Sequence, residues 1–165
     1  MAKESSFDIV SSVDMQEVDN AYGQAKKELA QRYDLKDSGS SIDLDKDKKT
    51  LTIVAPADFV VGQIKDIISS KLFKRGIDMT AVKWGNNENA SGGMVRCVGS
   101  IVEGIDRETA GVINKDIKAQ KFKAKVQIEQ DKLHVSSASR DTLQEVIAFV
   151  KSKDYGQPLQ FENYR

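Results

Sequence analysis

Lys123-Ala124-Lys125-Val126-Gln127-Ile128-Glu129 is followed, after Gln130-Asp131, by Lys132-Leu133-His134-Val135. Apolar and polar side chains alternate in both runs, which is the period of a half-buried β-strand. The two residues between the runs favour a tight turn. This stretch therefore predicts a β-hairpin with one apolar face and one polar, lysine-rich face.

Helical periodicity flanks the hairpin on both sides. Asp106 can cap one helix and Ser139 another, and the expected apolar positions are Ile105, Val112, Ile113 and Ile117 in the first and Leu143, Val146, Ile147 and Val150 in the second. Residues 94–102 and 159–164 are strand candidates before and after them. The second half of the chain thus predicts the order β-α-β-β-α-β.

The same order is expected in the first half. It runs through a strand at 7–13, a helix at 14–33, a hairpin at 42–53, a helix from Pro56 to Gly76 and a strand at 79–84. Residues 85–93 are rich in Asn, Ser and Gly and are the best candidate for a linker.

We predict an α+β fold of two tandem ferredoxin-like units, 1–88 and 89–165. Each unit would be a four-stranded antiparallel sheet with two helices on one face. The pattern leaves open an exchange of first strands between the units.

Composition narrows the setting of the protein. The 165 residues carry a formal net charge of zero, so bulk charge does not draw the chain to nucleic acid or membrane. Cys97 stands alone, which rules out an intramolecular disulfide. No apolar run reaches the roughly 20 residues of a membrane span, and the N-terminus lacks a signal-peptide core. A cytoplasmic protein is expected.

Enzyme and metal chemistry are disfavoured. No Gly-rich phosphate loop is present, and the chain has one histidine, His134, and one cysteine, Cys97, on separate predicted strands. The acidic run 43–47 resembles a calcium loop, but Lys48 and Val54 stand where such a loop needs Gly and Glu. We expect no catalytic residue, cofactor or metal.

Polar positions of the two sheets carry opposite charges. Alternation places Lys123, Lys125, Gln127, Lys132 and His134 on the open face of the second unit, joined by Arg96 if Val95 and Cys97 point inward. The first unit would expose Asp43, Asp45, Thr50 and Thr52. A basic sheet face can bind phosphates, although edge-strand lysines also prevent aggregation. Base stacking on the sheet is disfavoured, because Phe7 is the sole aromatic on the relevant strands.

Two further strings have both a structural and a functional interpretation. Lys74-Arg75-Gly76 can end a helix, with cations near its C-terminal dipole and Gly in the left-handed cap, or contact a phosphate. Ser139-Arg140-Asp141 can start a helix, whose N-terminal amides together with Arg140 can hold a phosphate.

Several strings along the chain resemble the YajQ family of bacterial nucleotide-binding proteins. They are residues 6–11 with Val13-Asp14, Lys74-Arg75-Gly76-Ile77, Gly104-Ile105-Asp106, Ser139-Arg140-Asp141 with Leu143-Gln144, Gln160-Phe161, and Asn163-Tyr164-Arg165. The resemblance implies a two-domain ferredoxin-like fold without known catalysis. It also implies cyclic di-GMP, GTP or transfer RNA as ligands, and a transcription regulator as a partner.

The sequence departs from the family pattern at Gln130, His134, Ala138 and Gly111, which lowers the positive charge of the second unit. We expect a non-enzymatic nucleotide-binding effector whose ligand is contacted by Lys123, Lys125, Arg140, His134, Arg75 and Lys74. The alternative is a protein-interaction adaptor for a transcription regulator that uses an open sheet face.

Overall fold

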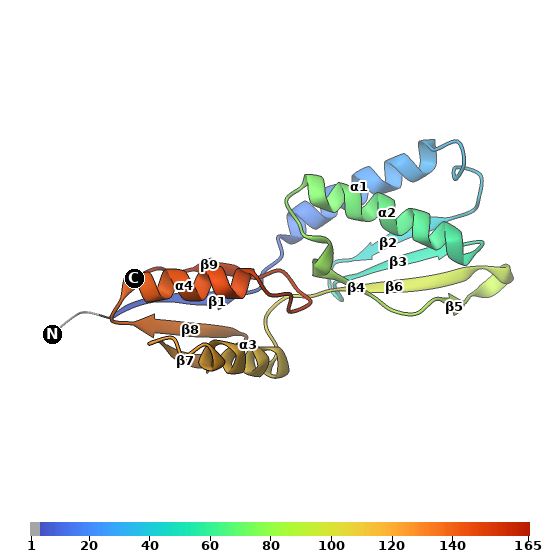
Figure 1. The fold of residues 1–165 in the computed structure, drawn as a ribbon. Helices are drawn as coiled ribbons and strands as arrows, with labels where there is room; N and C mark the ends of the chain where they lie inside the picture. Colours follow the sequence, from blue (N-terminus) through green and yellow to red (C-terminus); the bar gives the residue numbers. More distant parts are fainter. Residues whose placement is uncertain (1–3) are drawn as a thin grey trace. The chain divides into compact units, whose positions relative to one another are not determined.

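The computed structural model describes residues 4–165 and is an α+β protein with four α-helices and two antiparallel sheets in that range (Figure 1). One sheet has the strand order β7-β8-β1-β9. Its strands are β1 (Ser5–Val10), β7 (Lys125–Glu129), β8 (Lys132–Ser137) and β9 (Gln160–Glu162). The other has the order β2-β3-β6-β4, with β5 paired to β6. Its strands are β2 (Ser41–Asp45), β3 (Thr50–Ala55), β4 (Val82–Trp84), β5 (Glu88–Asn89) and β6 (Val95–Ile101).

The chain forms two compact units that are not its two contiguous halves. One, called here the terminal unit, combines the described residues up to Ser12 with Glu103–Arg165; the other, the central unit, is Val13–Val102. This division differs from a boundary between residues 88 and 89, because β1 pairs with β8 and β9 while β6 pairs with β3 and β4. The chain therefore passes between the units twice, after Ser12 and after Val102.

The Asn- and Gly-rich segment 85–93 is not a linker, contrary to the prediction from its composition. It connects β4 to β6, which are antiparallel neighbours in the same sheet, and β5 within it pairs with β6. The segment is thus a long hairpin connection inside the central unit. Turn-forming residues serve a hairpin and a linker equally well, so composition could not distinguish the two.

The helices begin largely where the sequence predicts. Asp14 caps α1 (Met15–Gln31), Asp106 caps α3 (Arg107–Ala119) and Ser139 caps α4 (Arg140–Lys151), each by accepting backbone N–H bonds through its side chain. Helix α2 (Asp58–Lys74) starts later than predicted. Ala57 is extended at its cap, which places Pro56 before the helix instead of in its first turn. The predicted strand 79–84 begins with the 3₁₀ turn Met79–Ala81, so that only Val82–Trp84 pairs as β4.

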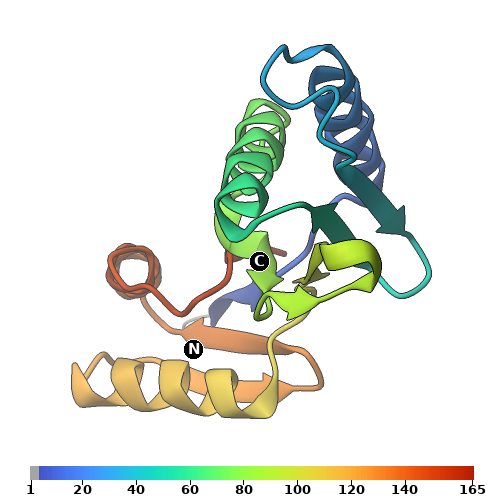
Figure 2. The ribbon, with the colours of Figure 1, turned by 90° about the vertical axis from the view of Figure 1, so that its right-hand side faces the viewer.

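Each unit has its own apolar core between one sheet face and two helices. In the central unit α1 and α2 lie side by side on the sheet (Figure 2). In the terminal unit Phe7, Ile9, Leu133 and Val135 point toward α3 and α4 and are fully buried. Strand alternation then directs Ser6, Asp8 and His134 to the opposite, open face. Within residues 4–165, no helix combines the length and apolarity that a bilayer span requires.

Candidate functional site

The first turn of α4 is built by a chain of serine hydrogen bonds. Ser139 Oγ accepts from Thr142 N at 3.2 Å, and Ser137 Oγ accepts from Ser139 N at 3.1 Å. Ser137 Oγ also donates to the carbonyl of Lys123 at 2.8 Å, which ties the end of β8 to the segment before β7. These bonds fix the N-terminus of α4 at one end of the terminal sheet, beside the start of β1.

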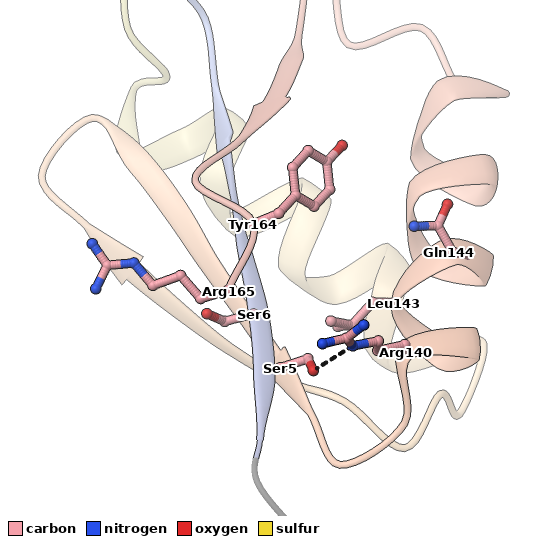
Figure 3. A pocket seen from close by; sticks show the side chains of 7 residues that line it. All are labelled: Ser5, Ser6, Arg140, Leu143, Gln144, Tyr164 and Arg165. Atoms are coloured by element: carbon pink, nitrogen blue, oxygen red, sulfur yellow. Dashed lines mark hydrogen bonds between the residues drawn. The ribbon is translucent and has the colours of Figure 1, made fainter.

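A pocket of about 290 Å³ lies at this helix end and is called the α4 pocket. It is lined by Ser5, Ser6, Arg140, Leu143, Gln144, Tyr164 and Arg165 (Figure 3). Arg140 Nε donates to Ser5 Oγ at 3.4 Å, which places the guanidinium beside the first residue of β1. Figure 3 shows Tyr164 and Gln144 above Arg140, while the side chain of Arg165 extends to the other side of β1.

Tyr164 is held in the pocket by the C-terminal segment. Ser6 and Arg165 exchange two backbone hydrogen bonds of 3.0 and 2.9 Å, which continue the β1 pairing beyond β9. Asn163 adopts a left-handed conformation with φ 57°, a region that Asn tolerates better than most residues. The Tyr164 ring lies 6.2 Å from the Phe7 ring between centroids, yet 60% of the residue stays exposed. One face of an aromatic ring is therefore available to a ligand.

A second pocket, about 240 Å³, lies on the open face of the same sheet and is called the open-face pocket. Its lining is Glu4, Ser6, Lys125, Gln127, His134 and Ser136. It brings together Lys125 and His134, two of the residues predicted to contact phosphate. Glu4, which also lines the pocket, offsets part of the positive charge of Lys125.

Asp8 is a buried residue of β1 that holds several side chains of this open face in place. Its carboxylate accepts from His134 Nδ1 at 2.7 Å, from Asn163 Nδ2 at 2.8 Å and from Lys132 Nζ at 3.3 Å, and the residue is 5% exposed. Burial by itself would raise the pKa of Asp8, but the hydrogen bonds from Asn163, His134 and Lys132 outweigh it and lower the pKa below its ordinary value. The ionised carboxylate thus holds His134 with Nδ1 as a donor, which leaves Nε2 for the pocket.

The other predicted site residues lie elsewhere. Lys123 is exposed next to β7, outside both pockets of the terminal unit described above. Lys74 and Arg75 belong to the central unit, where Arg75 Nη1 lies 3.6 Å from Glu17 Oε2. Lys74 borders a groove of about 370 Å³ with Lys27 and Lys71.

Two expectations about the sheet faces are corrected or limited. Arg96 does not join the lysines of the second hairpin, because β6 belongs to the central sheet, where Arg96 lies opposite Val54. Phe7 is 0% exposed and faces the helices, so it offers no stacking surface on the open face.

Sequence reasoning missed Tyr164, Gln144 and Asp8 as site residues. Tyr164 and Gln144 stand in strings that carry the family resemblance, Asn163-Tyr164-Arg165 and Leu143-Gln144, and that was the signal available for them. They line one pocket with Ser5 and Arg140 only in the folded chain.

Comparisons with known proteins show the family of this chain. The family model described as nucleotide-binding protein YajQ-like matches residues 5–165. The chain belongs to the YajQ-like family of nucleotide-binding proteins. It is 51% identical to a nucleotide-binding protein of Geotalea uraniireducens over 97% of this chain and 98% of the relative. It is 48% identical to one of Bdellovibrio bacteriovorus over the same shares, and 45% identical to one of Enterococcus faecalis over 99% of both chains.

The α4 pocket of this YajQ-like family member contains groups that can bind the phosphate and the base of a nucleotide. A guanidinium attracts phosphate, and so do the first amides of a helix; in α4 the amide of Thr142 is already bonded to Ser139 Oγ, which leaves those of Arg140 and Asp141 for a ligand. An exposed tyrosine ring can stack on a base, and the carboxamide of Gln144 can hydrogen-bond to a base edge. Among residues 4–165, no group of three His, Cys, Asp or Glu side chains is arranged to hold a metal ion.

Proposed function

We propose that this protein binds a nucleotide in the α4 pocket. The phosphate lies against Arg140 and the first amides of α4, and the base lies on Tyr164. One observation carries the proposal: Arg140, the first residue of α4, and the largely exposed ring of Tyr164 line a single pocket. A pocket with only the cation would serve any anion, and the ring adds a preference for nucleobases.

The size of the pocket bears on the ligand. At about 290 Å³ it lies at the lower end of small-molecule sites, which span roughly 300–1,000 Å³. It accommodates one nucleotide at a time: GTP, one nucleotide of an RNA strand, or one half of cyclic di-GMP. Lys123 and Lys125 on the same unit add positive charge for the remainder of a longer ligand such as transfer RNA, and His134 adds a ring nitrogen that can hydrogen-bond to it.

The test is a titration of GTP, cyclic di-GMP and transfer RNA at low salt with three proteins. Arg140→Ala should weaken binding about tenfold or more, since a charge-assisted phosphate contact is lost. Arg107→Ala is the matched control, because Arg107 holds the same first helical position in α3. It should leave the affinity unchanged. Absence of saturable binding to all three ligands, or equal losses in both variants, would overturn the proposal.

Tyr164→Leu separates base binding from phosphate binding. It should weaken nucleotide binding several-fold by removing the stacking surface. Inorganic phosphate should bind equally well to the original chain and to Tyr164→Leu when measured by its competition with the nucleotide. If Tyr164→Leu binds nucleotides as well as the original chain, the base does not lie on this ring.

We also infer the fold and setting in which this binding operates. Each unit is a ferredoxin-like β-α-β-β-α-β arrangement whose first strand comes from the other half of the chain, supported by the orders β7-β8-β1-β9 and β2-β3-β6-β4. The protein acts without catalysis in the bacterial cytoplasm. The names of the relatives, which state binding and no reaction, support the absence of catalysis.

An adaptor for a transcription regulator is the second candidate. It is favoured by the open face of the terminal sheet, since α3 and α4 both pack on the other face. Reversing the charges of Lys123 and Lys125 distinguishes the two functions. Loss of ligand binding with this variant supports a nucleotide site that includes the open face, whereas partner capture that survives it supports the adaptor.

A further inference from the structure

Strand β7 is an edge of the terminal sheet with β8 as its neighbour. It reads Lys125-Val126-Gln127-Ile128-Glu129. Ile128 is 42% exposed. An exposed apolar side chain on an unpaired edge strand favours pairing with another strand. The two end residues of the strand, Lys125 and Glu129, carry opposite charges and lie equally far from the central Gln127.

The backbone of β7 leaves its outer edge unpaired. Glu129 and Lys132 close a two-residue turn opposite each other, and such closing pairs are hydrogen-bonded. Alternation along the strand then directs the N–H and C=O groups of Lys125 and Gln127 toward β8, and those of Val126 and Ile128 outward. Within residues 4–165, no backbone bond outside the β7–β8 ladder engages Val126 or Ile128.

We propose that β7 is a self-association edge that pairs antiparallel with β7 of a second copy of this chain, about a two-fold axis at Gln127. Val126 and Ile128 of one copy then exchange backbone hydrogen bonds with Ile128 and Val126 of the other. Lys125 lies opposite Glu129 of the second copy, in the closely spaced type of cross-strand pair. The ion pair forms twice by symmetry, and the interface is isologous.

The other long edge strand shows that this complementarity is particular to β7. Strand β2 reads Ser41-Ile42-Asp43-Leu44-Asp45, so the same pairing would place Asp43 against Asp43. Like charges directly opposite each other are destabilising. The hydroxyl of Tyr22 also donates to the Ile42 carbonyl at 3.2 Å, which occupies part of that edge.

The contact is small. Two five-residue strands bury less than the roughly 1,600 Å² of a standard stable interface. The dimer is therefore weak and depends on concentration. It would join two terminal sheets into one continuous sheet, whose open face carries two copies of Lys125 and Gln127 near the axis. This association does not depend on nucleotide binding in the α4 pocket.

The test is sedimentation of the full chain over a wide concentration range, with charge variants. Lys125→Glu places Glu against Glu and Glu129→Lys places Lys against Lys, so each variant alone should self-associate more weakly, on the order of tenfold. An equimolar mixture of the two variants restores both ion pairs and should associate at least as well as the original chain. Circular dichroism verifies that each variant is folded.

Hydrogen exchange gives a readout without substitution. The outward amides of Val126 and Ile128 should become protected as concentration rises, while those of β2 stay unchanged. A chain that remains monomeric at millimolar concentration would overturn the proposal. So would a mixture of the two variants that associates no better than either variant alone.

Discussion

At the residue scale, Asp8 shows how the open face of the terminal sheet is held in place. The carboxylate sits on the polar face of β1, yet three donors cover it: His134, Asn163 and Lys132. A buried carboxylate stays ionised only when its hydrogen bonds compensate for lost hydration. Asn163 connects this network to the neighbouring Tyr164, so one carboxylate helps to position both pockets of the terminal unit.

Asp8 should therefore contribute stability that depends on pH. Its pKa is lowered in the folded protein, so the contribution is complete above the ordinary Asp pKa of about 3.9 and is lost as the pH falls through the lowered value. Asp8→Asn should lower the unfolding free energy at pH 7 by about 1–3 kcal/mol. It should also reduce the further loss of stability as the pH falls. Urea unfolding followed by circular dichroism at pH 7, 5 and 3 measures both effects.

The control is Asp34→Asn. The Arg32 hydrogen bond lowers the pKa of Asp34 as well, but this ion pair is exposed at the surface. Its replacement should leave stability nearly constant across the same pH range. Equal effects of the two substitutions would mean that the buried network around Asp8 has no special weight.

Asp141 gives a second prediction at this scale. It lies in the first turn of α4, where its negative charge competes with any phosphate held by Arg140 and the helix amides. Asp141→Asn should tighten GTP binding about two- to fivefold at low salt, and the gain should shrink as salt increases. Glu108→Gln, at the first turn of α3, is the matched control. An unchanged affinity in Asp141→Asn would place the phosphate away from α4.

At the element scale, β6 depends on a missing side chain. Gly99 lies opposite Trp84 on β4, and a Cβ at Gly99 would come within 2.7 Å of both the Trp84 ring and the Val82 side chain. The indole thus packs directly on the backbone of β6. This arrangement fixes the register of the β4–β6 pair, which residues 85–93 alone could not define.

Gly99→Ala should lower the unfolding free energy of the central unit by about 1–3 kcal/mol, because the packed indole must move. Gly62→Ala in α2 should raise it by about 0.5–1 kcal/mol, because a Cβ there meets nothing within 4 Å and alanine favours the helix. Trp84, the one tryptophan of the chain, reports unfolding by fluorescence. Equal stability of the two variants would contradict the packing argument.

The sequence was informative about elements wherever their signals are local. The caps at Asp14, Asp106 and Ser139, the helix end at Gly76 and both hairpins depend on residues a few positions apart, and all are confirmed. The late start of α2 could not be predicted, because Pro56 suits the position before a helix as well as its first turn. Of the residues that line the two pockets of the terminal unit, the sequence named Arg140, Lys125 and His134 as candidates, each one separately.

At the scale of the whole molecule, the unpredictable step is where β1 goes. The alternation that buries Phe7 and Ile9 would suit a central strand of either sheet, so nothing local selects β8 and β9 as partners. The α4 pocket depends on that choice, since Ser5 and Ser6 precede Arg140 by more than a hundred residues. A site formed across such a separation has no signature in a short window of sequence.

The strand exchange predicts which fragments of the chain fold. Residues 13–102 contain every strand of the central sheet, so this fragment should fold alone and unfold cooperatively. Residues 103–165 lack β1, the strand between β8 and β9 that carries the fully buried Phe7 and Ile9. That fragment should be unfolded by circular dichroism and should fold when a peptide of residues 1–12 is added.

A peptide with Phe7→Ser and Ile9→Ser is the control, and it should fail to restore the fold because it supplies backbone pairing without the buried side chains. Fragments 1–88 and 89–165 provide the opposite test. The first lacks β6 and the second lacks β1, each a strand with neighbours on both sides, so neither should show dispersed amide resonances. Mixing them supplies each missing strand in trans and should recover both sheets. If instead each fragment folds by itself, β1 and β6 are not required by the sheets in which they pair.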